Sequence, residues 1–156
     1  MRRLIALVLM LAPLGAHAQL ADTKILTLQA AKTMLAAAEA EATKNNWTMS
    51  IAVVDAAGEL IAFHHMDDAT FGSIAVSQGK ARTAARFRRP TKTFDSTVTA
   101  GRVSVITLDG VVAVEGGVPI IVNGRLLGAV GASGGTSPQD AQVARAGVEA
   151  LKPLRA

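Results

Sequence analysis

Two β-prone runs and the turn between them fill residues 49–65, MSIAVVDAAGELIAFHH. The runs cover residues 49–54 and 59–65, and the turn contains Gly58. This pattern is typical of a β-hairpin, whose strands run antiparallel. Helical patterns lie on both sides of the hairpin along the chain. We therefore expect an α+β fold in which an antiparallel sheet packs against helices.

Three segments carry helical patterns: residues 26–46, 70–88 and 137–151. The first is amphipathic, with Thr27 as its expected N-cap and Asn45-Asn46 as its expected end. Arg89-Pro90 should stop the second helix, because a residue before proline disfavours the helical region. Ser137-Pro138-Gln139-Asp140 reads as a capping box that opens the third.

Further strands are expected over residues 111–114, 118–122 and 125–133. Asn123-Gly124 between the last two is the strongest hairpin signal in the chain. Residues 91–105 are mixed, and we expect one short helix and a loop there. Together with the first hairpin, these runs predict a sheet of about five strands.

The N-terminus has the layout of a secretory signal peptide over residues 1–18. Arg2 and Arg3 precede an apolar run, and Ala16-His17-Ala18 supplies small residues for cleavage. The apolar run is too short to span a bilayer, which takes roughly 20 residues. We expect residues 19–156 to form one domain, exported to the periplasm or secreted, with no membrane span after processing.

Composition excludes several classes of protein. Without Arg2 and Arg3, the 16 basic residues fall to 14 against 12 acidic ones, which gives no nucleic-acid signal. The chain has no cysteine, so disulfides and thiolate sites are absent from it.

Residues 131–135, GASGG, match the G-x-S-x-G pattern of serine hydrolases. That fold places its histidine after the serine, whereas His64 and His65 lie upstream. We therefore interpret the segment as a flexible link into the last helix. The start of that helix is either an anion site or simply a well-capped terminus.

His64 and His65 are the only histidines after the leader. Successive side chains of a strand point to opposite faces, so the pair cannot chelate one metal together. A zinc site would need carboxylates such as Asp67 or Asp68. A single histidine is alternatively an axial haem ligand, or has no ligand duty.

Arg82, Arg86 and Arg89 follow a spacing of i, i+4, i+7 and share one face of the predicted helix. Such a stripe holds carboxylates, including haem propionates. It is alternatively a solvated face or an ion-pair surface between subunits.

Any haem (heme) in this chain must be non-covalent, because no C-x-x-C-H motif is present. The absence of cysteine and tyrosine also excludes thiolate and phenolate ligands to its iron. The remaining candidate ligands are histidine, methionine, lysine and hydroxyl groups. The histidines and methionines in question are His64, His65, Met34, Met49 and Met66.

Three groups of motifs resemble the GlcG/HbpS-like haem-binding family, which includes the C-terminal domain of PduO. They are residues 53–58 with 63–67, residues 80–84 with 87–91, and residues 116–120 with 128–131 and 133–134. The resemblance covers residues 26–151. It implies a profilin-like α/β sandwich, frequent homo-oligomers and, in some members, haem binding outside the cytoplasm. Other members resemble corrinoid-linked or metabolic-operon accessories.

Two positions depart from the family pattern. His65 stands where arginine is expected, which adds a potential ligand, and Asp68 stands where glycine is usual in the turn.

The resulting hypothesis is an exported haem-sensing or haem-carrier protein that binds haem non-covalently and lacks catalytic activity of its own. The alternative is an accessory or binding protein for a corrinoid or for a small organic acid held by the arginines; a structural or partner-binding module is a third reading. The candidate cofactor-binding residues, with the two histidines as candidate metal ligands, are His64, His65, Met66, Arg82, Arg86 and Arg89.

Overall fold

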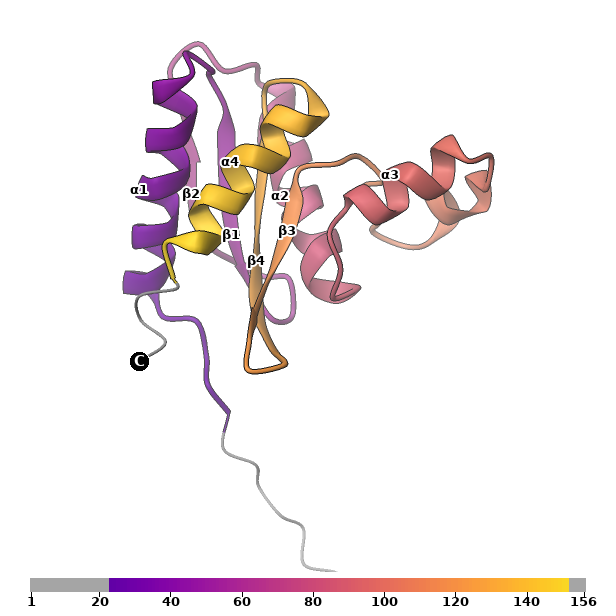
Figure 1. Ribbon diagram of the computed structural model, residues 1–156, viewed down its shortest axis with the longest axis horizontal. Coiled ribbons are helices and arrows are strands. Elements are labelled where there is room, and N and C mark those ends of the chain that lie inside the picture. The colour runs from indigo at the N-terminus through magenta and orange to yellow at the C-terminus, as the bar shows by residue number, and fades with distance from the viewer. Residues whose placement is uncertain (1–22, 152–156) are drawn as a thin grey trace, which may run out of the picture.

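Four antiparallel strands form one sheet in the computed structural model, which describes residues 23–151 (Figure 1). The strand order is β2-β1-β4-β3, so that β1 and β4 are central. The strands are β1 Ser50–Asp55, β2 Leu60–His65, β3 Gly117–Val122 and β4 Arg125–Ser133. The helices are α1 Leu28–Lys44, α2 Gly72–Arg86, α3 Lys92–Thr99, the 3₁₀ helix η1 Val103–Thr107 and α4 Ser137–Glu149.

Helices cover both faces of the sheet, with α1 and α4 on one face and α2 on the other (Figure 1). Strand alternation sorts the side chains of β1 between the two layers. Ile51 and Val53 pack into the core with α1 and α4, whereas Ala52 and Val54 pack with α2. Gly131 in β4 allows close approach of α2, because a Cβ there would collide with the backbone of that helix. The predicted α+β class is therefore confirmed.

Both predicted hairpins form. In the first turn, Asp55 Oδ1 accepts hydrogen bonds from two backbone N–H groups of the turn, and Gly58 adopts a φ of 89°. In the second, Asn123 and Gly124 have φ values of 51° and 75°. Positive φ at both positions matches the turn that suits the twist of antiparallel strands.

The expected fifth strand is absent from the described residues, because residues 111–114 lie against α2 instead of joining the sheet. The N–H of Val112 donates to Thr83 Oγ1 over 2.9 Å, and that hydroxyl donates to the carbonyl of Gly110 over 3.2 Å. A helix side chain thus takes the backbone hydrogen bonds that a neighbouring strand would otherwise satisfy.

Helix ends follow the predicted chemistry with two shifts. Thr27 caps α1 as expected, and Asn46 adopts the left-handed conformation after it, with a φ of 57°. Helix α2 ends at Arg86, two residues earlier than predicted, because Arg88 adopts a φ of 54°. The capping box of α4 begins at Thr136, one residue earlier than predicted, and its N–H donates to Gln139 Oε1 over 2.8 Å.

The segment from α3 through η1 projects from the body of the molecule (Figure 1). We call residues 92–110 the arm. Phe94 is the only buried residue of α3 and Val105 the only one of η1. Much of the arm's apolar surface is therefore left facing outward.

Candidate functional site

His64 and His65 point to opposite faces of the sheet, as strand alternation predicts. His64 pairs with Ile51 in the register of β1 and β2, on the face covered by α1. Its Nδ1 lies 2.6 Å from Glu39 Oε2 of α1, and both side chains are well exposed. The two histidines therefore belong to different surfaces and do not chelate one ion.

His65 lies on the α2 face beside polar and aromatic partners. It pairs with Ser50 in the register, and its Nδ1 is 2.8 Å from Ser50 Oγ. Ser50 Oγ is in turn 2.7 Å from Ser73 Oγ of α2. The imidazole stacks on Phe71 with ring centroids 6.0 Å apart and an interplanar angle of 25°. His65 itself is exposed, so this ring is held on one side and open to ligands on the other.

Phe71 is 85% exposed although it is a large aromatic side chain. It immediately precedes α2, whose first turns add exposed surface at Gly72, Ala75 and Val76. Phe71, Ala75 and Val76 are apolar, and of these Phe71 contacts His65 directly. We call His65, Phe71, Gly72, Ala75 and Val76 the His65 surface.

The methionines do not reach the His65 surface. Met34 and Met49 are completely buried in the core between the sheet and α1. Met66 is half-buried and packs against that same core. A thioether ligand would thus require repacking, which leaves the imidazole of His65 as the accessible nitrogen ligand on this face.

The turn after β2 contains Asp68, at a position where the resemblance led us to expect glycine. Asp68 adopts a φ of 62°, a left-handed conformation that aspartate tolerates better than most residues. Within residues 23–151, no cluster of three or more histidine, aspartate or glutamate side chains is arranged to hold a metal ion. A zinc site built on this turn is therefore unsupported.

The arginines lie apart from the histidines. Arg82 Nε donates to the carbonyl of Gly58, and Arg86 donates to the carbonyl of Ala57 and to Glu59. Both therefore brace the first hairpin turn. At about 1.5 Å per residue, the length of α2 places Arg86 roughly 20 Å from Ser73, which lies beside His65.

Arg89 does not continue the stripe, because α2 has already ended. Its guanidinium lies over the ring of Phe94, 5.7 Å from the centroid. The predicted face shared by three arginines is therefore wrong. With Arg82 and Arg86 already bonded to the turn, the geometry gives little ground for an acid-binding site.

A buried ion pair is present that the sequence did not reveal. Lys80 Nζ lies 2.6 Å from Asp140 Oδ2, and their side chains are 1% and 4% exposed. Lys80 also donates to the carbonyl of Ala132 over 3.3 Å. The pair joins α2 on one face of the sheet to α4 on the other, beside the end of β4.

Asp140 also occupies the start of α4. Its Oδ1 accepts the N–H of Gly135 over 3.0 Å, so the chain itself supplies an anion to this helix terminus. Burial raises the pKa of Asp140, and the hydrogen bond and charge of Lys80 oppose that rise. The alternative of a site for an external anion is therefore not supported.

Ser133 is not assembled into a nucleophile–base pair with His65. It pairs with Ser50 across β1 and β4, so that β1 separates it from His65 on β2. Two strand spacings amount to roughly 10 Å, well beyond hydrogen-bond reach.

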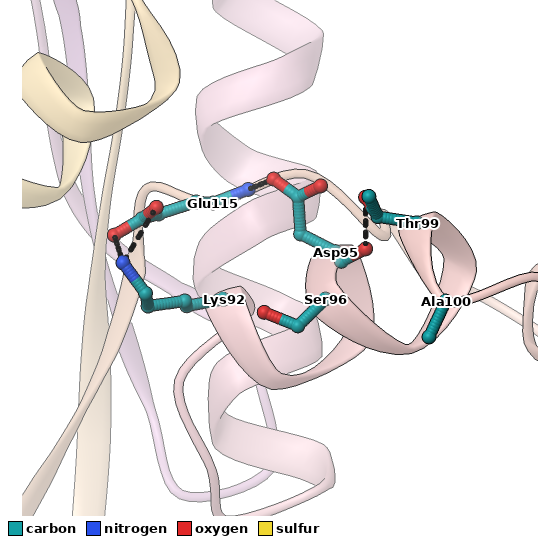
Figure 2. Close-up of a pocket in the computed structure, with 6 residues that line it drawn as sticks. All are labelled: Lys92, Asp95, Ser96, Thr99, Ala100 and Glu115. Atoms are coloured by element: carbon teal, nitrogen blue, oxygen red, sulfur yellow. Dashed lines mark hydrogen bonds and ion pairs between the residues drawn. The ribbon is translucent and has the colours of Figure 1, made fainter.

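An open pocket of about 410 Å³ lies on the arm, lined by residues of α3 and by Glu115 (Figure 2). Lys92 Nζ contacts the carboxylate of Glu115 over 3.3 Å, and the N–H of Glu115 donates to Asp95 Oδ2 over 2.9 Å. Thr99 Oγ1 donates to the carbonyl of Asp95. As Figure 2 shows, these groups bond to one another across the pocket. They define no centre that converges on a ligand.

The three-layer arrangement and antiparallel strand order define an α+β protein. A family model described as haem degrading protein HbpS-like matches residues 26–149. The chain belongs to this HbpS-like family.

Relatives support the assignment. Protein GlcG of Escherichia coli K12 is 48% identical over 109 residues, which cover 70% of this chain and 81% of GlcG. A crystal structure of a double mutant of Streptomyces reticuli HbpS superposes with a TM-score of 0.80 at 30% identity, covering 90% of this chain and 97% of that one. A structure named as a PduOC–haem complex gives 0.75 at 26% identity, covering 81% and 95%.

No helix within residues 23–151 is both long enough and apolar enough to cross a membrane. The proposed leader, residues 1–18, lies outside the described residues.

Proposed function

We propose that this protein binds haem non-covalently on the His65 surface, with the His65 imidazole as an axial ligand. The observation that carries the proposal is an exposed imidazole fixed through Nδ1 by Ser50 and stacked beside exposed Phe71. Membership of the HbpS-like family and the haem complex of a structural relative support it. Imidazole is a common haem ligand, and the absence of cysteine excludes a thioether attachment.

The residues that follow Phe71 on α2 suit an apolar ligand. The exposed side chains of Phe71, Ala75 and Val76 offer apolar area to a ligand held by His65. Gly72 has open space around it, so no side chain blocks the approach. Burying such apolar area is worth about 25 cal/mol per Å². Ligation and apolar burial therefore act at the same place.

Titration of the protein with haemin tests this proposal, with the Soret band as the signal. The wild type should give a saturable shift, which His65→Ala should remove or strongly weaken. His64→Ala is the matched control, because it removes the neighbouring imidazole from the opposite face and should leave the shift intact. A wild type without a shift, or a His65→Ala variant that binds as well as wild type, would overturn the proposal.

We further propose that the protein acts outside the cytoplasm as a haem sensor or carrier. The support is the leader pattern of residues 1–18, from Arg2 and Arg3 to Ala16-His17-Ala18. Fractionation of cells that express a C-terminally tagged chain should recover protein beginning at Gln19 outside the cytoplasm. An intact precursor in the cytosol would contradict export.

We also propose that the protein binds haem without degrading it. The family model is described as haem degrading, so degradation is the alternative to test. The haem-loaded protein should keep its Soret band when incubated with ascorbate in air. A progressive loss of the Soret band with release of iron, faster than for free haem, would show haem degradation and contradict this part of the proposal.

We propose a homo-oligomer in which the arm contacts a second copy. Val103 and Ile106 are 60% and 59% exposed on the arm, and Leu108 is 45% exposed. Exposed Arg102 and Asp109 flank these residues with opposite charges. Two arms related by a twofold axis would therefore bring Arg102 of one copy near Asp109 of the other, around an apolar centre.

Size-exclusion chromatography with light scattering measures the mass of the protein in solution and so tests the arm contact. Wild type should exceed the monomer mass, and Ile106→Glu should shift it toward the monomer. A monomeric wild type at about 100 µM, above the dissociation constant of most stable dimers, would contradict the proposal.

A further inference from the structure

A chain of hydrogen bonds runs from the His65 imidazole into the start of α2. His65 Nδ1 lies 2.8 Å from Ser50 Oγ, and Ser50 Oγ lies 2.7 Å from Ser73 Oγ. The Ser73 hydroxyl donates to the carbonyl oxygen of Thr70. We call these two serines the serine relay.

The number of hydrogens available in the serine relay determines which group donates in each hydrogen bond. A hydroxyl has one hydrogen to donate, and a carbonyl can only accept. Ser73 gives its hydrogen to Thr70, so Ser73 must accept from Ser50. Ser50 has then used its own hydrogen and must accept from His65 Nδ1. The proton of a neutral His65 ring is therefore on Nδ1.

A histidine protonated on Nδ1 carries its free lone pair on Nε2. The hydrogen bond made by one ring nitrogen sets which nitrogen binds a metal. We propose that Ser50 and Ser73 are positioning residues that hold His65 in the Nδ1–H form, presenting Nε2 as the iron-ligating atom. The assignment of Nε2 to iron rests on the proposed haem binding, whereas the protonation of Nδ1 does not.

Burial makes the relay hard to replace by water. Ser50 is 0% exposed and Ser73 is 3% exposed. Without either hydroxyl, bulk water has no easy access to restore the same hydrogen bond. His65 itself is an exposed residue, so the part of its side chain that solvent reaches lies away from buried Ser50. The ring is thus anchored from the protein side and open on the ligand side.

The protonation state is measured first on the haem-free protein. Long-range ¹H–¹⁵N correlation spectra at about pH 8.5, where imidazole side chains are ordinarily neutral, distinguish the two ring nitrogens. Wild type should show a protonated Nδ1 and a bare Nε2 for His65. A wild-type ring protonated on Nε2 would overturn the inference without any variant being needed.

Ser73→Ala is the more selective variant, because it keeps the Ser50 hydroxyl but frees its hydrogen. Ser50 can then donate to Nδ1, and the spectra should move toward a mixture of the two ring forms. Ser50→Ala should lose the bias altogether. Loss of a partner that orients a metal ligand typically costs 10- to 100-fold in affinity, so haemin binding by Ser50→Ala should weaken by roughly that factor.

Ser77→Ala is the matched control. Ser77 lies one turn further along α2, is completely buried, and donates to the carbonyl of Ile74 just as Ser73 donates to that of Thr70. It should change neither the ring form nor the haemin affinity. Equal losses in Ser77→Ala and Ser73→Ala would show a merely structural effect and would overturn the relay.

The two levels of the proposal fail in distinguishable ways. Haemin binding unaffected by His65→Ala would remove the iron assignment while leaving the apo spectra as predicted. The wrong ring form in apo wild type would remove the relay even if haemin binding depends on His65.

Discussion

Removal of the buried cation Lys80 should destabilise the fold strongly. Lys80→Met keeps an unbranched side chain of similar length but leaves Asp140, whose side chain is 4% exposed, without its counter-charge. Breaking one side of a buried ion pair typically costs about 3–5 kcal/mol. With about 2.1 cal/mol/K of unfolding entropy per residue over roughly 130 residues, that loss lowers the melting temperature by roughly 11–18 °C.

The loss of stability in Lys80→Met should also depend on pH, because an unpaired buried carboxylate can take up a proton and become neutral. Burial already raises the pKa of Asp140, and loss of Lys80 removes an opposing influence. The deficit of Lys80→Met should therefore be largest near neutral pH and shrink toward about pH 4, as the carboxyl becomes neutral.

Urea unfolding followed by circular dichroism measures this deficit at each pH. Arg86→Met is the matched control, since Arg86 pairs with Glu59 at the surface, where such pairs contribute at most about 1 kcal/mol. A cost for Lys80→Met below about 1 kcal/mol at neutral pH, or one that grows on acidification, would refute the reasoning.

Three further outcomes are expected. Burial raises the pKa of Asp140 above its ordinary value of 3.8. The stability that proton binding by Asp140 contributes is therefore complete below that pH and is lost as the pH rises through the raised pKa. In urea unfolding, the stability advantage of wild type over Asp140→Asn should shrink from about pH 3 to 7, and an advantage that grows would contradict this sign. Gly131→Ala should lower the free energy of unfolding by about 1–3 kcal/mol or more, because the added Cβ meets the Ser77 carbonyl oxygen. Gly72→Ala, which has open space around the added Cβ, should be neutral or slightly stabilising. Equal melting temperatures of the two variants would contradict this. Phe71→Ala should weaken haemin binding yet change unfolding by less than about 0.5 kcal/mol, because the ring is 85% exposed, and a large loss of stability would show a core role instead.

Local chemistry was sufficient to predict much of the fold. Asn123-Gly124 specifies its turn through positive φ, and Thr27 caps α1 through a hydrogen bond to the first turn. The opposite orientations of His64 and His65 follow from alternation alone. Each of these features depends on residues close together in the chain.

Features decided by distant partners could not be predicted. Residues 111–114 have the composition of a strand, but the N–H of Val112 in this segment bonds to Thr83 of α2 instead of to a neighbouring strand. Nothing near Lys80 in sequence indicates that its partner is Asp140, sixty residues away. The arginine stripe failed because it extended α2 beyond the point where Arg88 leaves the helical conformation.

The site was predicted only in part for the same reason. His65 carried a visible signal, since histidines are rare in this chain and the resemblance led us to expect arginine at this position. Ser50 and Ser73 carried none, because serine is common and their contact joins β1 to α2 across the fold.

A crystal structure of the protein grown with haemin tests the central claim most directly. We expect the porphyrin to contact Phe71 and its iron to be bonded to Nε2 of His65. Iron bonded to His64, to Nδ1 of His65 or to a residue elsewhere in the chain would contradict the account.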